Sequence, residues 1–305
     1  MYQPKYNITN KILKDIGLVE AAREVITNAP LVPSWEAKFR EEALMRTVHY
    51  GTHLEGNELN FTEAAQVMQG KEIVGKDRDI QEVINYRNVL KYIGEFGGDR
   101  VVGETDISEN TIKHLHKLTV EKILPPDQCG MYRSTQVVVK NSLTGEISFK
   151  PPPALEVPFL MTDFSLWLNS NQTKDMHPVL QAGVTHYELA AIHPFVDGNG
   201  RVARAIATLV LFTQEYDIKK FFSLEEHYDK DAQSYYNALQ SVNVANGNNL
   251  TGWLEYFVEG LAIELNRIKE KVQKLSVDIK LKNDLGGRQV ALNERQLKLV
   301  EYIQQ

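Results

Sequence analysis

Apolar residues recur mostly at helical spacing along this chain. Between residues 34 and 55 the apolar positions share one side of a helix, and Ser34 is its predicted N-cap. Another predicted helix carries Ile112 and Ile123 and ends at Pro125, because proline interrupts helices. The same spacing predicts the remaining helices, over 79–93, 157–170, 179–192, 200–216, 231–242 and 250–277.

One stretch departs from the helical pattern. Residues 136–140 and 147–150 are rich in residues that favour strands, and a polar turn cluster at 141–145 joins them. Three prolines at 151–153 end this stretch. The expected fold is therefore mainly α, with one small β-hairpin.

The last residues suggest a change of unit. Residues 280–293 are polar and contain Gly286-Gly287, which predicts a linker, and 292–303 begin a new amphipathic helix. We expect four parts along the chain, which are an N-terminal helical region (1–100), a core (101–245), a C-terminal helix (246–279), and a linker with the start of a further segment (280–305).

Composition narrows the class of protein. An apolar content of 43% with 24% charged residues is typical of soluble globular chains. The net charge of −6 supplies no overall basic field for nucleic acid, and the first residues lack a secretory signal. Cys129 is the only cysteine, which excludes an internal disulfide. We expect a cytoplasmic protein without membrane contact.

The segment 193–204, which reads HPFVDGNGRVAR, combines residues suited to phosphate chemistry. Gly198 and Gly200 allow close backbone approach just before a helix, whose first N–H groups attract anions. Arg201 and Arg204 lie three positions apart and can reach one ligand with forked donors.

Two further residues of this segment suit transfer chemistry. Asp197 supplies the kind of oxygen ligand that Mg²⁺ prefers beside phosphates, and His193 can accept a proton near neutral pH. Each residue alone would more often be structural. Together with Phe195 and Asn199 these residues specify eight positions of the segment. A chance match to all eight, somewhere in this chain, is on the order of one in 10⁸.

The segment resembles the Fic family motif, His-x-Phe-x-Asp/Glu-Gly-Asn-Gly-Arg-x-x-Arg. The resemblance implies a compact Fic-type helical bundle that uses Mg²⁺ and ATP and transfers AMP to a Ser, Thr or Tyr hydroxyl of a target protein. It also implies a role for each motif position: His193 as the base, Phe195 as a core anchor, Asp197 as the Mg²⁺ ligand, Gly198, Asn199 and Gly200 as the phosphate nest, and Arg201 and Arg204 on the β- and γ-phosphates.

Two less specific features extend the resemblance over roughly residues 36–260. The predicted hairpin resembles the family's flap, which docks the target; its docking residues would be Gln136, Val137, Val138 and Val139. Tyr236, in the sequence YYxxL, resembles a family element near the nucleotide base.

Residues 52–57 resemble the end of the family's inhibitory helix. In that helix a glutamate, here Glu55, pairs with the second motif arginine, here Arg204, and keeps it from the γ-phosphate. The Ser/Thr position of the family pattern is Gly51 in this chain, which weakens the expected anchoring of the helix.

Several alternatives stay open. Within the same fold, the chemistry could be transfer of UMP, phosphate or phosphocholine, or removal of AMP. From a different class, the chain could be a non-enzymatic regulatory or DNA-associated module with an inactive site. His49 and His53 have metal-ligand spacing but no third ligand, so we interpret them as packing or surface residues.

The final helical stretch, residues 292–303, resembles the start of a winged-helix module and is too short here to predict nucleic-acid binding. A homodimer is possible.

Overall fold

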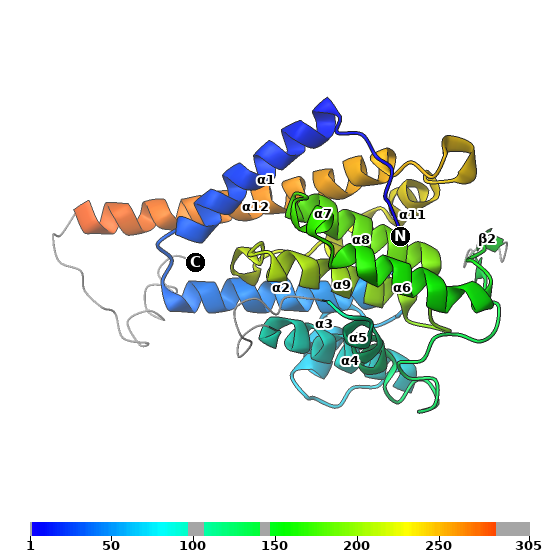
Figure 1. Cartoon of the computed structure of the whole chain (residues 1–305). Coiled ribbons are helices and arrows are strands. Elements are labelled where there is room, and N and C mark those ends of the chain that lie inside the picture. The colour runs from blue at the N-terminus through cyan, green and yellow to red at the C-terminus, as the bar shows by residue number, and fades with distance from the viewer. Residues whose placement is uncertain (1, 97–106, 141–146, 285–305) are drawn as a thin grey trace.

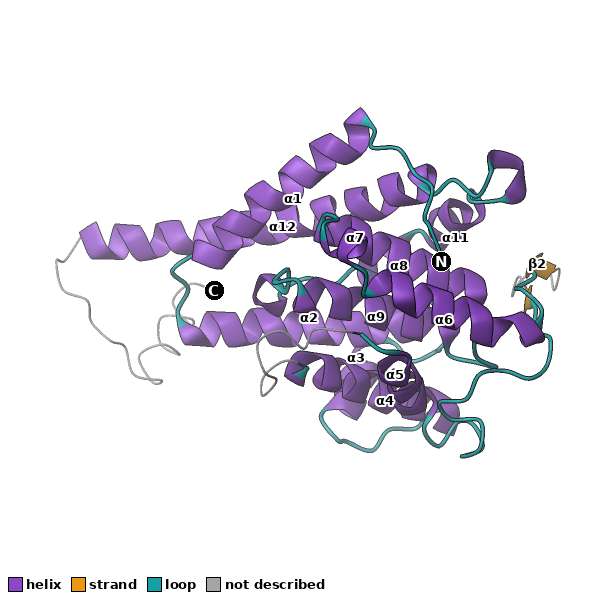
Figure 2. Ribbon diagram, in the orientation of Figure 1, coloured by secondary structure: helices purple, strands orange, loops and turns teal. Residues whose placement is uncertain are grey.

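The computed structural model describes residues 2–96, 107–140 and 147–284, and in these ranges the chain is almost entirely helical (Figure 2). The helices are α1 (Asn10–Asn28), α2 (Pro33–His53), α3 (Phe61–Met68), α4 (Asp77–Glu95), α5 (Glu109–Val120), α6 (Val157–Leu168), α7 (Asn171–Lys174), α8 (Pro178–Ile192), α9 (Asn199–Thr213), α10 (Glu225–Lys230), α11 (Ala232–Gln240) and α12 (Thr251–Asp284). Short 3₁₀ turns lie at Ala154–Glu156, Ile218–Lys220 and Val244–Asn246. The predicted mainly α fold is confirmed.

Helices α8 and α9 form the centre of the molecule (Figure 1). Most of their side chains are buried, which is the pattern of a helix surrounded on all sides rather than of a surface helix. Helices α2, α4 and α5 cover one side of this pair, and α1 packs along α12 on the other. The loop between α8 and α9 is therefore held between the two most central helices of the core.

A single large hydrophobic cluster joins these layers. It runs from Ile12 and Val19 of α1 through Phe195 of the central loop to Trp253 and Leu265 of α12. A smaller cluster fills the space between α2, α3 and α4. No helix within the described ranges is both long and apolar enough to span a membrane.

Some predicted boundaries were wrong. Helix α2 begins at Pro33 with Val32 as N-cap, not with Ser34, because proline suits the first helical turn, where no N–H partner is needed. Helix α5 ends at Val120, so Ile123 lies outside it. The cause is Asn85 of α4, whose amide donates to the carbonyls of Thr119 and Glu121.

The C-terminal helix also differs from its prediction. Helix α12 continues to Asp284, so the predicted linker that begins at residue 280 starts inside a helix. The rest of that linker and the amphipathic stretch 292–303 lie outside the described residues. Helices α1, α3, α7 and α10 were not predicted individually.

The hairpin is shorter than predicted. Strand β1 (Val139–Lys140) pairs antiparallel with β2 (Ile147–Phe149), and Val139 faces Phe149. Residues 136–138 are not part of the strand. Continuing the register would bring Val137 and Gln136 opposite Pro151 and Pro152, which have no N–H to donate. The predicted turn residues 141–145 lie outside the described residues.

Candidate functional site

The segment 193–198 is the sharp loop that joins α8 to α9. His193 ends α8 in the left-handed conformation, with φ of 51°, which turns its side chain away from the helix axis. Its Nδ1 donates to the carbonyl of Ala190 over 3.2 Å, and this fixes the tautomer because a carbonyl only accepts. The lone pair of His193 is therefore on Nε2.

Burial lowers the pKa of His193 below its ordinary value, against the opposing effect of the bond to Ala190. A lowered pKa keeps the imidazole neutral at physiological pH. A neutral ring with Nδ1 occupied and Nε2 available is the form that a general base requires.

Phe195 anchors this loop, as expected. Its ring is fully buried and stacks on His116 of α5, with centroids 3.7 Å apart. His116 accepts the Gly130 N–H on Nδ1 and donates from Nε2 to the carbonyl of Asp197 over 3.1 Å. Burial lowers the pKa of His116 to about 4, so this neutral pattern persists over the whole physiological range.

Two other side chains fix the backbone of the loop. Asn199 receives the N–H of Phe195 and donates to the carbonyl of the same residue, so its side chain is used up in shaping the loop. Arg133 donates to the carbonyls of His193 and Pro152 over 2.8 and 2.6 Å. Only the backbone N–H of Asn199 can therefore take part in the predicted phosphate nest.

The N-terminus of α9 is built for a close anion. Gly198 has φ of 77°, and a Cβ there would lie 3.0 Å from Val120, so only glycine fits without strain. The first N–H groups of α9 have no partner within the helix, and the helix dipole adds positive potential at this end.

Both motif arginines are almost completely buried. Arg201 lies 3.3 Å from Glu82 and 3.7 Å from Asp197, yet its Nε and Nη1 make no hydrogen bond with the described residues. The Nε of Arg204 is likewise without an acceptor there. Unused buried guanidinium donors beside a helix N-terminus fit a polyphosphate.

Glu55 reaches the same place from the end of α2. Its carboxylate lies 2.8 Å from Nη2 of Arg204, and the same nitrogen donates to the carbonyl of Gly51 over 2.9 Å. A Cβ on Gly200 would collide with Glu55 Oε1, so the carboxylate lies directly against the start of α9. The ion pair that the resemblance implied is present in the structure.

Gly51 has a different effect from the one expected. A Cβ at this position would collide with the ring of Tyr86 and meet Glu225 at 3.2 Å. The glycine thus lets α2 pack closely against α4 and α10, and its own carbonyl supplies the contact to Arg204. The hydroxyl of the adjacent Thr52 donates within its own helix, to the carbonyls of Val48 and His49.

Asp197 is engaged on both carboxylate oxygens. Oδ2 lies 2.6 Å from Nη2 of Arg78, and Oδ1 accepts the N–H of Gly198. Burial alone would raise the pKa of Asp197, but Arg201, Arg78 and the Gly198 N–H outweigh it, and the pKa lies below its ordinary value.

An ionised carboxylate beside a polyphosphate site fits Mg²⁺, which takes one or two carboxylates together with phosphate oxygens. The described residues contain no group of three or more acidic, histidine or cysteine ligands.

Tyr236 of α11 lies at the edge of the site. Its hydroxyl donates to the carbonyl of Leu54 over 3.2 Å, next to Glu55. Its neighbour Tyr235 is buried and forms a hydrogen bond with His186, which is buried as well.

The two histidines at metal-ligand spacing have separate environments. His49 is buried, whereas His53 is exposed and pairs with Asp229.

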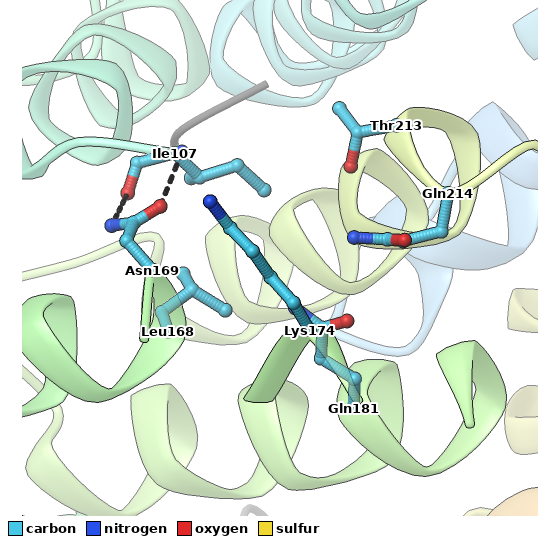
Figure 3. Close-up of a pocket in the computed structure, with 7 residues that line it drawn as sticks. All are labelled: Ile107, Leu168, Asn169, Lys174, Gln181, Thr213 and Gln214. Atoms are coloured by element: carbon cyan, nitrogen blue, oxygen red, sulfur yellow. Dashed lines mark hydrogen bonds between the residues drawn. The ribbon is translucent and has the colours of Figure 1, made fainter. Parts of the chain in front are cut away.

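Two cavities lie elsewhere. One, of about 350 Å³, is lined mainly by apolar side chains of α2, α4 and α9. The other, of about 10 Å³, holds at most one water, and Figure 3 shows Asn169 bonded to both backbone groups of Ile107 at its wall. Neither cavity is lined by a residue of the segment 193–204.

Sequence reasoning missed three residues of the site: Arg78, Glu82 and His116. They come from helices that pack against the loop rather than from the loop itself. Arg133 was expected only as part of residues 130–133, which precede the hairpin and resemble the family's flap, and not as a contact of the loop. Asn57 was expected only as part of residues 52–57 at the end of the inhibitory helix; in the structure it donates to Glu82 over 3.1 Å.

Comparisons with known proteins agree with this geometry. The sequence profile of the Fic/DOC family matches residues 106–211. The chain is 31% identical over 179 residues to the protein adenylyltransferase Fic of Drosophila grimshawi, covering 58% of this chain and 35% of that protein. It is 26% identical over 283 residues to the protein of the same name from Culex quinquefasciatus, covering 91% and 52%. The chain thus spans between about a third and a half of these relatives.

Solved structures share the fold. A Fic family protein from Desulfovibrio desulfuricans matches with a TM-score of 0.73 and 25% identity, over 88% of this chain and 77% of that one. A Fic domain containing signaling protein from Bacteroides thetaiotaomicron matches with a TM-score of 0.70 and 22% identity, over 87% and 97%. Residues 106–211 of this chain therefore match the Fic/DOC family model, and the described residues share the helical fold of solved Fic family structures.

Proposed function

We propose that this chain is a protein adenylyltransferase that moves AMP from Mg-ATP to a Ser, Thr or Tyr hydroxyl of a target protein. The observation that carries the proposal is the neutral His193 imidazole, whose Nε2 is available beside a helix N-terminus with two buried arginines. The names of the curated relatives, protein adenylyltransferase Fic, point the same way.

The residues divide the reaction between them. The first N–H groups of α9 and the free donors of Arg201 bind the phosphates, and Arg204 joins them once Glu55 leaves. His193 Nε2 accepts the proton of the target hydroxyl as its oxygen bonds to the α-phosphorus and pyrophosphate departs. Asp197 would hold Mg²⁺, which neutralises phosphate charge when bound.

Glu55 is proposed as the restraint on this reaction. Its carboxylate and the Gly51 carbonyl together occupy Nη2 of Arg204, so a γ-phosphate must compete with both for that donor. Tyr236 adds a hydrogen bond to the same segment and lies at the rim where the nucleotide base would sit. Release of Glu55 is then the step that permits productive ATP binding.

The hairpin is proposed as the docking flap. Strand β1 and the residues that lead into it, Gln136 to Val138, offer an extended backbone along which a target segment can be added as a strand. Its base is held near the catalytic loop because Arg133 contacts both His193 and Pro152. A cytosolic location remains the expectation from the sequence.

Intact-protein mass spectrometry tests the proposal. The wild type and the variants Glu55→Gly and His193→Ala are incubated with Mg²⁺ and each nucleoside triphosphate in turn. Glu55→Gly should gain the mass of AMP from ATP, and His193→Ala should gain none. The matched control, Glu58→Gly, removes an exposed carboxylate whose ion-pair partner among the described residues is Lys76, and should behave as wild type.

Other outcomes would decide against the proposal. A mass gain from UTP alone would replace AMP by UMP as the transferred group. The mass of a single phosphate would indicate phosphate transfer. No gain in any variant, with itself or with a cell extract as target, would favour a non-enzymatic role or removal of AMP.

A further inference from the structure

A second ion pair reaches the motif from a helix outside it. Arg78 lies in the first turn of α4, and its Nη2 is 2.6 Å from Asp197 Oδ2 while its Nε is 3.1 Å from Glu82 Oε1. Arg201 approaches the same two carboxylates, at 3.3 and 3.7 Å. Two cations and two anions thus form a closed ring around Asp197.

The ring gives both carboxylate oxygens of Asp197 a positively polarised partner before any divalent cation arrives. Oδ2 is held by Arg78, and Oδ1 accepts the Gly198 N–H and faces Arg201. A cation bound at Oδ2 would lie beside a guanidinium of the same sign, and the two would repel each other. The guanidinium and a divalent cation therefore compete for this oxygen.

The members of the ring differ in their freedom to move. Arg201 is buried, with a side chain 2% exposed, whereas the side chain of Arg78 is 56% exposed. Glu82 is buried and further fixed by Asn57, which donates to its Oε2. Arg78 is the most exposed member, ahead of Asp197 at 32%, and can withdraw into solvent while the others stay in place.

We infer that Arg78 competes with the divalent cation for Asp197, so that metal–nucleotide binding requires Arg78 to leave Oδ2. The inference rests on the proposed function, in which Asp197 is the metal ligand. It makes Arg78 a second restraint on the site, separate from Glu55, and one that sets the cation concentration at which the site fills. Arg78 itself takes no part in the chemistry.

Direct metal binding tests this inference without measuring turnover. The Glu55→Gly protein, saturated with a non-hydrolysable ATP analogue, is titrated with Mn²⁺ and followed by electron paramagnetic resonance. Adding Arg78→Gln should lower the half-saturating Mn²⁺ concentration by about three- to fivefold, the size expected for a partly exposed charge contact. Affinity for the analogue in EDTA, measured by calorimetry, should change much less.

Two further variants sharpen the result. Arg78→Lys keeps the charge without the forked donors and should give an intermediate value. Lys91→Gln removes an exposed positive charge from the same helix, where the only carboxylate contact given by the structure is Glu95 at 4.0 Å, and should leave Mn²⁺ binding unchanged.

The contrary outcomes are distinct. An unchanged half-saturation in Arg78→Gln, or a higher one, overturns the inference; a higher one would mean that Arg78 helps to bind the nucleotide. If the Glu55→Gly parent binds no Mn²⁺ with the analogue, the proposed function fails first and this inference with it.

Discussion

Arg204 lies 2.8 Å from the carboxylate of Glu55, and this contact joins the end of α2 to the most buried part of α9. Arg204 is buried and also interacts with the buried carboxylate of Glu225, so its position is fixed by the core. Glu55 is partly exposed, so its carboxylate can move into solvent without crossing the buried core. The pair therefore has one fixed member and one movable member, as an exchangeable contact requires.

Release of Glu55 should expose a nucleotide site that can be measured by thermal stability. ATP with Mg²⁺ should raise the melting temperature of Glu55→Gly more than that of the wild type, because only the folded state binds the ligand. At an ATP concentration of 100 times Kd the expected stabilisation is about 2.7 kcal/mol. Equal shifts in both proteins would mean that Glu55 does not compete with ATP. Glu58→Gly serves as the control.

Gly51→Ala should destabilise the protein. The added methyl group collides with Tyr86, and overpacking of this kind costs about 1–3 kcal/mol. Because α2 must shift to make room, the Gly51 carbonyl and Glu55 should also hold Arg204 less well, and basal AMP transfer should rise. Gly17→Ala in α1, where a Cβ meets open space, should not lower the unfolding free energy measured in urea. Equal stability of the two variants would contradict the close packing at Gly51.

The pH dependence of the reaction should report His193. The neutral ring is the active form, and its pKa lies below the ordinary value of 6.5. The rate of Glu55→Gly should therefore be nearly constant above that pH and fall only as acid protonates the ring. The profile of kcat/KM between pH 5 and 8 measures this. An inflection above 6.5 would argue against the buried, neutral histidine as the base.

The sequence alone was enough for the parts of the site that are local. The loop from His193 to Arg204 is one continuous segment between two helices, so its residues are close whatever the rest of the fold does. Phe195 was expected to be a core anchor because of its place in the motif, and it is buried. Glu55 was found only through the resemblance of the residues around it.

Contacts between distant elements could not be read in the same way. Arg78 and Glu82 lie four apart on α4, which predicts only an ordinary surface pair. Their place beside Asp197 and Arg201 depends on how α4 packs against α9. Gly51 looked like a weak point of its helix, because the ring of Tyr86 that needs the space comes from another helix. The first strand was predicted to begin at residue 136 but begins at Val139, because its pairing depends on the partner strand, which ends just before the prolines at 151–153.

The central claim is that this site transfers AMP and that Glu55 restrains it. Its most direct test is incubation of Glu55→Gly with Mg²⁺ and ATP labelled either at the α-phosphate or at the γ-phosphate, followed by measurement of label bound to protein. The account predicts label from the α-phosphate alone, more than in the wild type, and none when His193→Ala is added. Label from the γ-phosphate, or equal α-label in wild type and Glu55→Gly, would contradict it.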